Sequence, residues 1–99
     1  MEERAWWLYV LECEGGALYT GITVDVARRL TQHRRGTAAA YTRLRRPLGL
    51  LGAVKVGTRS DALKLEYAFK QLPAGEKWRR ATAMGVPAVI TGSIDPSPL

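Results

Sequence analysis

Two short apolar runs joined by glycines do most to limit the folds open to this chain. Residues 6–13 read WWLYVLEC, a run of aromatic and branched side chains that favours a β-strand, and residues 18–22 (LYTGI) indicate a returning strand. Two glycines between the runs can adopt the positive φ angles that tight turns require. We therefore predict a β-hairpin that carries Tyr9 on its first strand and Tyr19 on its second.

The length of the hairpin loop decides whether the two tyrosines share a face of the sheet, because side chains alternate along a strand. A two-residue loop pairs Glu12 with Tyr19 and puts the phenols on opposite faces. A three-residue loop pairs Cys13 with Tyr19 and puts both phenols on one face. The residue pattern leaves both registers open, and we predict the one that brings Tyr9 and Tyr19 together.

After the hairpin, the pattern predicts a helix, a loop and a third strand. The helix covers residues 24–35, with Thr23 as its N-cap, and ends before a glycine. Residues 37–47 (TAAAYTRLRRP) show no clean period and are predicted to form a basic loop that carries Tyr41. Residues 48–56 (LGLLGAVKV) are apolar on both alternating faces, so we expect a strand in the centre of the sheet.

The last part of the chain predicts two helices and an extended tail. Ser60 can cap a helix over residues 61–72. Its predicted core stripe is Ala62, Leu65, Ala68, Phe69 and Leu72. A further helix starts at Pro73, and the proline-rich residues 86–99 are expected to be extended or mobile. The chain is thus predicted to be an α+β domain over residues 1–85, with a three-stranded antiparallel or mixed sheet and the order β-β-α-β-α-α.

The chain is strongly basic, with 15 Lys+Arg against 9 Asp+Glu and a net charge of +6. This balance favours a polyanionic partner such as nucleic acid or an anionic membrane surface, with a solvated basic face as the alternative. One stretch concentrates the charge in Arg28, Arg29, Arg34, Arg35, Arg43, Arg45 and Arg46. A single cysteine and a single histidine exclude an intrachain disulfide and a Cys/His zinc set. No apolar run approaches the roughly 20 residues of a bilayer span, so we expect no membrane insertion and a cytoplasmic location.

Three polar side chains fall beside apolar helix stripes, where packing alone does not require them. Glu66 lies three residues before Phe69, and a carboxylate there costs free energy unless it is paired, hydrogen-bonded or bound to a metal. Arg29 and His33 lie one helical turn apart on a shared face. An arginine there can bind a phosphate, and a histidine can donate to a phosphate or move a proton. Each residue also has a purely structural alternative. Glu66 can reach water or pair with an arginine, Arg29 can be exposed, and His33 can be a hydrogen-bonded residue at the boundary of the core.

Three segments in order resemble the GIY-YIG nuclease family, and its small single-domain bacterial branch in particular. They are LYTGITVDVARR, YTRLRRP and RSDALKLEYAFKQL, within a resemblance that covers residues 6–80. The paired tyrosine elements of the family stand here as WLYV around Tyr9 and YTG from Tyr19. The sequence departs from the family pattern in two places: WL replaces the Gly-Ile of the first element, and Ile22 stands where many relatives have Lys or Arg.

The resemblance implies hydrolysis of a phosphodiester with one divalent metal ion, Mg²⁺ or Mn²⁺. Glu66 would hold the ion, since a single carboxylate plus waters suits a hard cation. Arg29 would stabilise the phosphoryl oxygens. Tyr19 would act as the base toward the attacking water, with Tyr9 hydrogen-bonded nearby or sharing the role. His33 would orient the phosphate or the water, or shuttle the proton.

The resemblance also implies a nucleic-acid substrate, with DNA expected over RNA, and endonuclease action in DNA repair, recombination or processing. Salt-dependent backbone contacts would come from Arg28, Arg34, Arg35, Arg43, Arg45 and Arg46. Tyr41 would stack on a base or anchor its loop. A protein partner would supply specificity. The rival functions are a non-catalytic nucleic-acid-binding module and a partner-docking module on the same fold.

Overall fold

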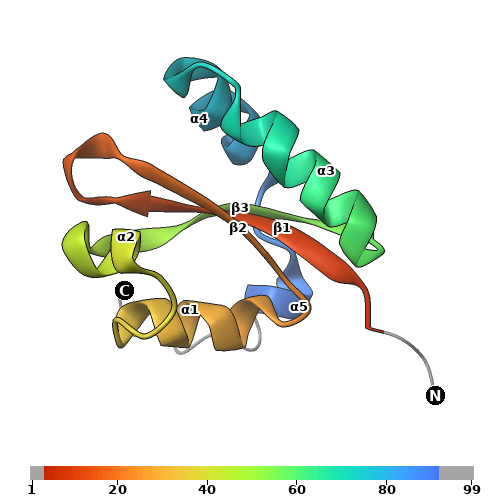
Figure 1. Ribbon diagram of the computed structural model, residues 1–99, viewed down its shortest axis with the longest axis horizontal. Coiled ribbons are helices and arrows are strands. Elements are labelled where there is room, and N and C mark those ends of the chain that lie inside the picture. The colour runs from red at the N-terminus through yellow and green to blue at the C-terminus, as the bar shows by residue number, and fades with distance from the viewer. Residues whose placement is uncertain (1–3, 92–99) are drawn as a thin grey trace.

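The computed structural model describes residues 4–91 as a three-stranded antiparallel sheet with helices on both faces (Figure 1). The strands, in the spatial order β2-β1-β3, are β1 (Trp6–Cys13), β2 (Leu18–Thr23) and β3 (Pro47–Gly57). The helices are α1 (Val26–Arg34), α2 (Ala40–Leu44), α3 (Arg59–Lys70), α4 (Ala74–Met84) and α5 (Ala88–Thr91), with a 3₁₀ turn, η1, at Glu14–Gly16. The predicted α+β class and element order are confirmed, and the short helices α2 and α5 are additional.

Strand β1 is the centre of the sheet, which corrects the expectation that residues 48–56 form the central strand. Those residues belong to β3, which lies at an edge and pairs with β1. Leu51 and Val54 of β3 pack with one apolar cluster. Leu50 and Ala53 pack with the cluster on the other face. The apolar pattern of this strand therefore reflects helices on both faces of the sheet, and not neighbouring strands on both sides.

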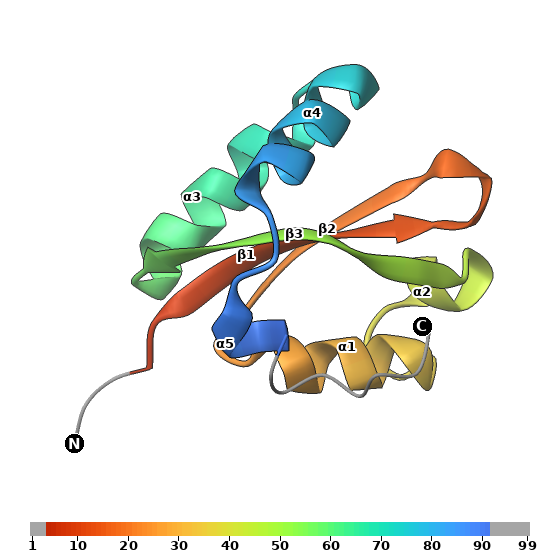
Figure 2. The same cartoon turned by 180° about the vertical axis from the view of Figure 1, so that it is seen from behind.

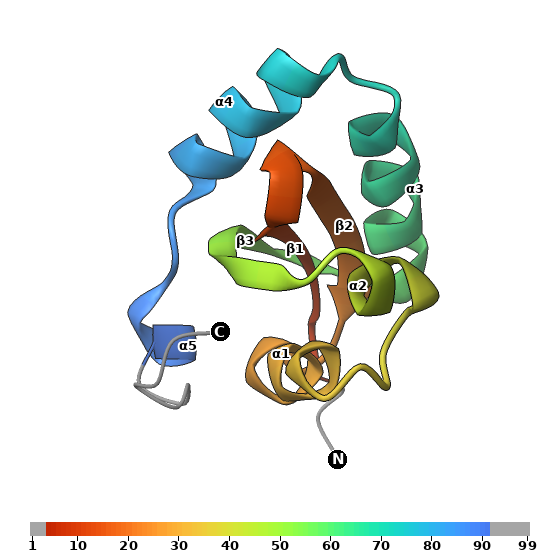
Figure 3. The same cartoon turned by 90° about the vertical axis from the view of Figure 1, so that its left-hand side faces the viewer.

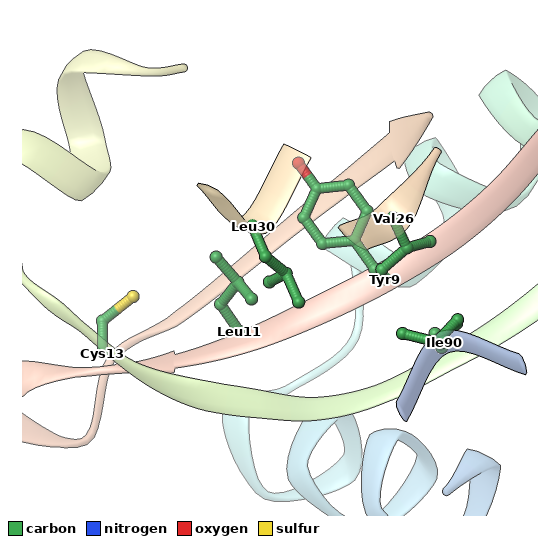
Figure 4. Packing of buried hydrophobic residues seen from close by; sticks show 7 residues of the cluster. Tyr9, Leu11, Cys13, Val26, Leu30 and Ile90 are labelled. Carbon is green, nitrogen blue, oxygen red and sulfur yellow. The ribbon is translucent and has the colours of Figure 1, made fainter. Parts of the chain in front are cut away.

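Helices α3 and α4 cover one face of the sheet, and α1, α2 and α5 lie on the other (Figure 1). Figure 2 shows the same layers from behind, and Figure 3 shows them from the side. The buried residues under α3 and α4 are Leu8, Val10, Phe69 and Ala81. The buried cluster on the α1 face, drawn in Figure 4, contains Tyr9, Leu11, Cys13, Val26, Leu30, Ala53 and Ile90. Alternate residues of β1 thus belong to two different cores.

The hairpin register puts Tyr9 and Tyr19 on one face of the sheet, as predicted. Tyr9 pairs with Gly21 and Leu11 pairs with Tyr19, so the two tyrosines point to the same side. The loop at residues 13–17 is longer than either length considered from the sequence. The loop is two residues longer than the three-residue loop, and because side chains alternate every two residues, the same side chains still share a face. Both of its glycines adopt positive φ.

Two helices begin at caps other than the predicted ones. Asp25, and not Thr23, caps α1: its carboxylate accepts the backbone N–H three residues later at 3.0 Å. Thr58, and not Ser60, caps α3 through a hydroxyl that accepts the backbone N–H three residues later at 3.1 Å. In each case the cap is the residue with an extended backbone whose side-chain oxygen reaches that N–H, and residue type alone does not distinguish the two candidates.

The segments that contain α2 and α3 also differ from the prediction. Residues 37–47 are not a continuous loop, because α2 lies within them. A helix of five residues is too short to produce a periodic apolar pattern. On α3, Ala62 and Phe69 are buried as predicted. Leu65 and Ala68 are exposed, because α3 lies in the outer layer and buries only the side that faces the sheet.

The segment after α4 folds back onto the α1 face. The prolines of residues 86–99 predict an extended conformation, but Ala88–Thr91 form α5. Ile90 is 5% exposed and belongs to the cluster that contains Tyr9. Residues 92–99 lie outside the described residues, and the domain boundary at residue 85 stays a prediction. Across residues 4–91, no helix combines the length and the apolar character needed to cross a bilayer.

Candidate active site

The side chains of Tyr9, Tyr19 and His33 form one aromatic cluster on the α1 face of the sheet. The ring centroids of the two tyrosines are 6.3 Å apart. The imidazole centroid lies 5.8 Å from that of Tyr9 and 4.9 Å from that of Tyr19. The three residues come from β1, β2 and α1, so the cluster forms only when α1 has packed against the hairpin.

Gly21 allows the ring of Tyr9 to lie across strand β2. It is paired directly with Tyr9, and a Cβ added to it would lie 2.5 Å from the Tyr9 hydroxyl oxygen and 2.7 Å from Cζ. Any larger residue would therefore displace the ring. Gly21 is a positioning residue to which the sequence analysis assigned no role, although it ends the quoted YTG element.

His33 is buried, and both of its ring nitrogens have partners. Nε2 lies 2.8 Å from the Tyr9 hydroxyl, and Nδ1 lies 2.8 Å from the Thr42 hydroxyl. Because the Thr42 hydroxyl donates its proton to the Ala39 carbonyl at 3.2 Å, it accepts from Nδ1–H, and Nε2 accepts from Tyr9. Burial first, and the charge of Arg29 second, lower the pKa of His33 to about 4, so the imidazole is neutral at pH 7.

Thr42 is a site residue that the sequence analysis missed. It is 2% exposed on α2 and fixes both the tautomer and the orientation of His33. Its segment, YTRLRRP, is among those that carry the family resemblance, but nothing in residues 37–47 indicates which side chains point inward. With both nitrogens engaged, His33 acts on its surroundings through Tyr9 and does not itself face an open position for a phosphate.

The two phenols differ in burial and in the charges around them. Tyr9 is 2% exposed, and burial raises its pKa far above the usual value, with Tyr19 as the second cause. Burial also raises the pKa of the half-buried Tyr19, and the charge of Glu66 raises it further. Arg29 and hydrogen bonding with Tyr9 lower the pKa of Tyr19. Tyr19 is therefore the phenol that loses its proton more readily and that solvent can reach.

Arg29 and Glu66 bring opposite charges to the tyrosines from helices on different faces of the sheet. Helix α3 packs against the edge strand β2, and the charge of Glu66 raises the pKa of both tyrosines from that side. The Glu66 side chain is 20% exposed, and its Oε2 lies 3.6 Å from Lys70 Nζ. Arg29 forms no salt bridge within residues 4–91, which leaves its guanidinium open to an anionic ligand.

The donors at this site fit a hydrated hard cation held by one carboxylate. In the part of the chain that the structure describes, no three His, Cys, Asp or Glu side chains gather into a potential metal cage. Glu66 is a single carboxylate whose charge acts on both tyrosines. Mg²⁺ and Mn²⁺ take oxygen ligands, and Mg²⁺ keeps several waters, so either suits a site of this composition better than zinc does.

Tyr41 extends the aromatic cluster toward solvent. Its ring centroid lies 5.9 Å from that of Tyr19, with the ring planes at 33°, and the residue is 40% exposed. The predicted nucleic-acid-binding arginines are all exposed: Arg28, Arg34, Arg35, Arg43, Arg45 and Arg46. They do not form one group, because Arg45 lies beside the hairpin loop, where it would contact a Cβ on Gly15 at 3.5 Å.

Comparison with known proteins assigns the chain to a family. The GIY-YIG catalytic domain matches residues 5–77. A UPF0213 protein of Cupriavidus pinatubonensis is 55% identical over 75 residues, which cover 76% of this chain and 83% of the relative. A UPF0213 protein of Nitratidesulfovibrio vulgaris is 38% identical over 96 residues, covering 97% and 87%. Two solution NMR structures share the fold. A protein from E. faecalis has a TM-score of 0.57 and 39% identity, with 83% of this chain and 88% of that protein covered. A UPF0213 protein from Bacillus halodurans has a TM-score of 0.52 and 34% identity, with 93% of this chain and 98% of that protein covered.

Proposed function

The chain belongs to the GIY-YIG family, among its small UPF0213 members, and on this basis we propose that it is a divalent-metal-dependent endonuclease. It would hydrolyse phosphodiester bonds of DNA in preference to RNA, in DNA repair, recombination or processing. The observation that supports this most is the cluster of two phenols and an imidazole beside β2, on which the charges of Arg29 and Glu66 both act. Packing alone does not require charges of both signs next to two tyrosines.

In this proposal Tyr19 is the base that takes a proton from the attacking water. It is half-buried, so a water can reach it, whereas Tyr9 is enclosed. Its pKa is raised by burial and by Glu66, so a cation that neutralises Glu66 removes one cause of the increase and leaves the opposing effect of Arg29. The rate should then rise by about tenfold per pH unit below the pKa of Tyr19, because the phenolate fraction does so.

Tyr9 and His33 act as positioning residues behind Tyr19. Tyr9 keeps its proton at pH 7 because burial raises its pKa, and it donates that proton to Nε2 of His33. Thr42 holds the imidazole in the tautomer that can accept it. The bond between Tyr9 and Nε2 fixes the Tyr9 ring, whose centroid lies 6.3 Å from that of the Tyr19 ring, and so holds the proposed base in place.

Glu66 would hold the divalent ion, which would supply positive charge to the leaving oxygen. The ion pair of Glu66 with Lys70 is 3.6 Å long and partly exposed, so giving it up costs little free energy. Arg29 would bind the non-bridging phosphoryl oxygens, since its guanidinium has no carboxylate partner in residues 4–91. These groups together would neutralise the charge that develops on the phosphate.

The exposed arginines of α1, of α2 and of the residues that directly follow each helix would bind the nucleic-acid backbone. Contacts of this kind release counterions, so affinity should fall as salt rises. They carry no base sequence information by themselves. Selection of a particular DNA site would therefore come from the structure of the substrate or from a protein partner.

The proposal is tested by assaying cleavage of branched, nicked and single-stranded DNA, and of RNA, with Mg²⁺, Mn²⁺ or EDTA. Two variants each remove one negative charge from α3 without changing size: Glu66→Gln at the site, and Asp61→Asn at the first turn as the matched control. We expect metal-dependent cleavage that Glu66→Gln abolishes and Asp61→Asn retains, with similar DNA affinity in both.

Three results would contradict the proposal. Cleavage that survives Glu66→Gln would show that the Glu66 carboxylate does not hold the metal ion that the reaction needs. Tight binding of DNA without cleavage of any substrate, with any metal, would identify a non-catalytic binding module on this fold. Binding that ignores nucleic acid but saturates with a protein would identify a docking module.

A further inference from the structure

Helix α2 presents two adjacent residues in opposite ways. Thr42 points inward, is 2% exposed and is bonded to His33. Tyr41 points outward, is 40% exposed and lies against the ring of Tyr19. The hydrogen bond of Thr42 therefore fixes the short helix against α1, and the same helix fixes the Tyr41 ring beside the proposed base.

The tyrosine rings form a series that becomes more exposed outward. Tyr9 is enclosed, Tyr19 is half-buried, and Tyr41 is the outermost ring, with centroid separations of 6.3 Å and 5.9 Å between successive members. Within residues 4–91, the aromatic neighbour of Tyr41 is Tyr19, and the ring is otherwise partly open to solvent. A flat ring held on one side and open on the other is the geometry on which a nucleic-acid base stacks.

We propose that Tyr41 is a stacking platform for an unpaired base, and that the substrate carries a single-stranded segment at the position of cleavage. This inference rests on the proposed nuclease function and names the substrate class of the same site. Inside a duplex both faces of each base are covered by neighbouring bases, so a base can reach Tyr41 only after it is unstacked. Because Tyr41 touches Tyr19, the stacked base belongs to a nucleotide next to the phosphate that Tyr19 faces.

The charges around Tyr41 agree with this substrate. The charge of Arg29 acts on Tyr19, the ring neighbour of Tyr41, so a strand whose base rests on Tyr41 passes a cation for its backbone. Stacking accepts every base, since each has a π face, so the platform would select strand structure without selecting sequence.

The test measures binding in a Glu66→Gln background, which prevents cleavage. The probe is a single-stranded oligonucleotide in which thymine alternates with the fluorescent base 2-aminopurine, and the comparison is the same strand in a continuous duplex. The variants are Tyr41→Leu, which removes the ring, Tyr41→Phe, which keeps it, and Tyr67→Leu. Tyr67 is the matched control, because it is 71% exposed on α3 and has no ring contact among the described residues.

We expect single-stranded DNA to quench the 2-aminopurine fluorescence on binding to the parent protein, as stacking does. Tyr41→Leu should lose the quenching and about tenfold of the affinity for the single strand, with duplex affinity unchanged. Tyr41→Phe and Tyr67→Leu should behave like the parent. Quenching that survives Tyr41→Leu, or an equal loss of affinity for single strand and duplex, would overturn the inference.

A second measurement separates stacking from damage to the site. The ¹⁵N shifts of His33 report its tautomer, and they should be the same in Tyr41→Leu as in the parent if α2 stays in place. Failure of this inference is distinct from failure of the proposed function. Cleavage of duplex and single strand at equal rates, unaffected by Tyr41→Leu, would reject only the substrate class. Stacking without any cleavage by the wild-type protein would reject only the nuclease.

Discussion

The two faces of strand β1 are made of neighbouring residues, and both bury apolar side chains, but one of them also buries a hydrogen-bonded phenol and imidazole. Leu8 and Val10 point into an apolar cluster with Phe69 and Ala81. Tyr9, between them, points to the opposite face, where it meets a phenol and an imidazole. The strand therefore carries an apolar core on one side and, on the other, a second core in which Leu11 and Cys13 pack beside the tyrosine of the candidate active site.

The site face is stable because its buried polar groups have partners. Across residues 4–91, no buried side-chain nitrogen or oxygen lacks a hydrogen bond. His33 bonds to both Tyr9 and Thr42, so its burial does not leave an unsatisfied donor or acceptor. The face under α3 and α4 is stabilised by apolar packing. On the site face, each buried polar group needs its hydrogen-bond partner, because burial without one costs free energy.

The largest effect should come from the apolar face. Phe69→Ala removes a ring that is 4% exposed and should lower the free energy of unfolding by about 3–5 kcal/mol, measured by urea denaturation. Tyr67→Ala, on the exposed side of the same helix, is the control and should change stability little. Cleavage per folded molecule should be retained in Phe69→Ala. A folded Phe69→Ala protein that has lost its chemistry would break the division between the faces.

A smaller effect on stability should come from His33 as the pH falls. Its folded pKa of about 4 lies below the ordinary value of 6.5, so the unfolded chain takes up the proton first. Stability is therefore complete above pH 6.5 and is lost as the pH falls toward 4, by about 3 kcal/mol. The chain has one histidine, so NMR titration of its imidazole measures this pKa directly. A value near 6.5 in the folded protein would contradict the buried hydrogen-bonded pair.

The third prediction concerns Gly21, which determines where the Tyr9 ring lies. Gly21→Ala places a Cβ against the Tyr9 hydroxyl and should lower the free energy of unfolding by about 1–3 kcal/mol through overpacking. It should also break the bond to Nε2, so the pKa of His33 should change along with the cleavage rate. Gly75→Ala, on α4 with no atom near its added Cβ, is the control. An unchanged His33 titration in Gly21→Ala would show that the ring is not held there.

The sequence predicts the parts of this molecule that depend on local pattern. The hairpin and the element order follow from alternation and glycine positions, whereas the shared face of Tyr9 and Tyr19, which the pattern leaves open, is a choice that the hairpin register confirms. Thr42 escapes prediction because its importance comes from a contact with α1, nine residues away in sequence. The edge position of β3 escapes it as well, since a strand covered by helices on both faces shows the same apolar pattern as a central strand.

The most direct test of the account is the single-turnover cleavage rate of Tyr19→Phe, which removes one oxygen atom from the proposed base. We predict that the rate falls by about 10²–10⁴-fold, the range for loss of a general base, while DNA affinity stays within a few-fold of wild type. The free energy of unfolding should change little, because Tyr19 is only half-buried. A Tyr19→Phe protein that cleaves at the wild-type rate would contradict the assignment of chemistry to this face.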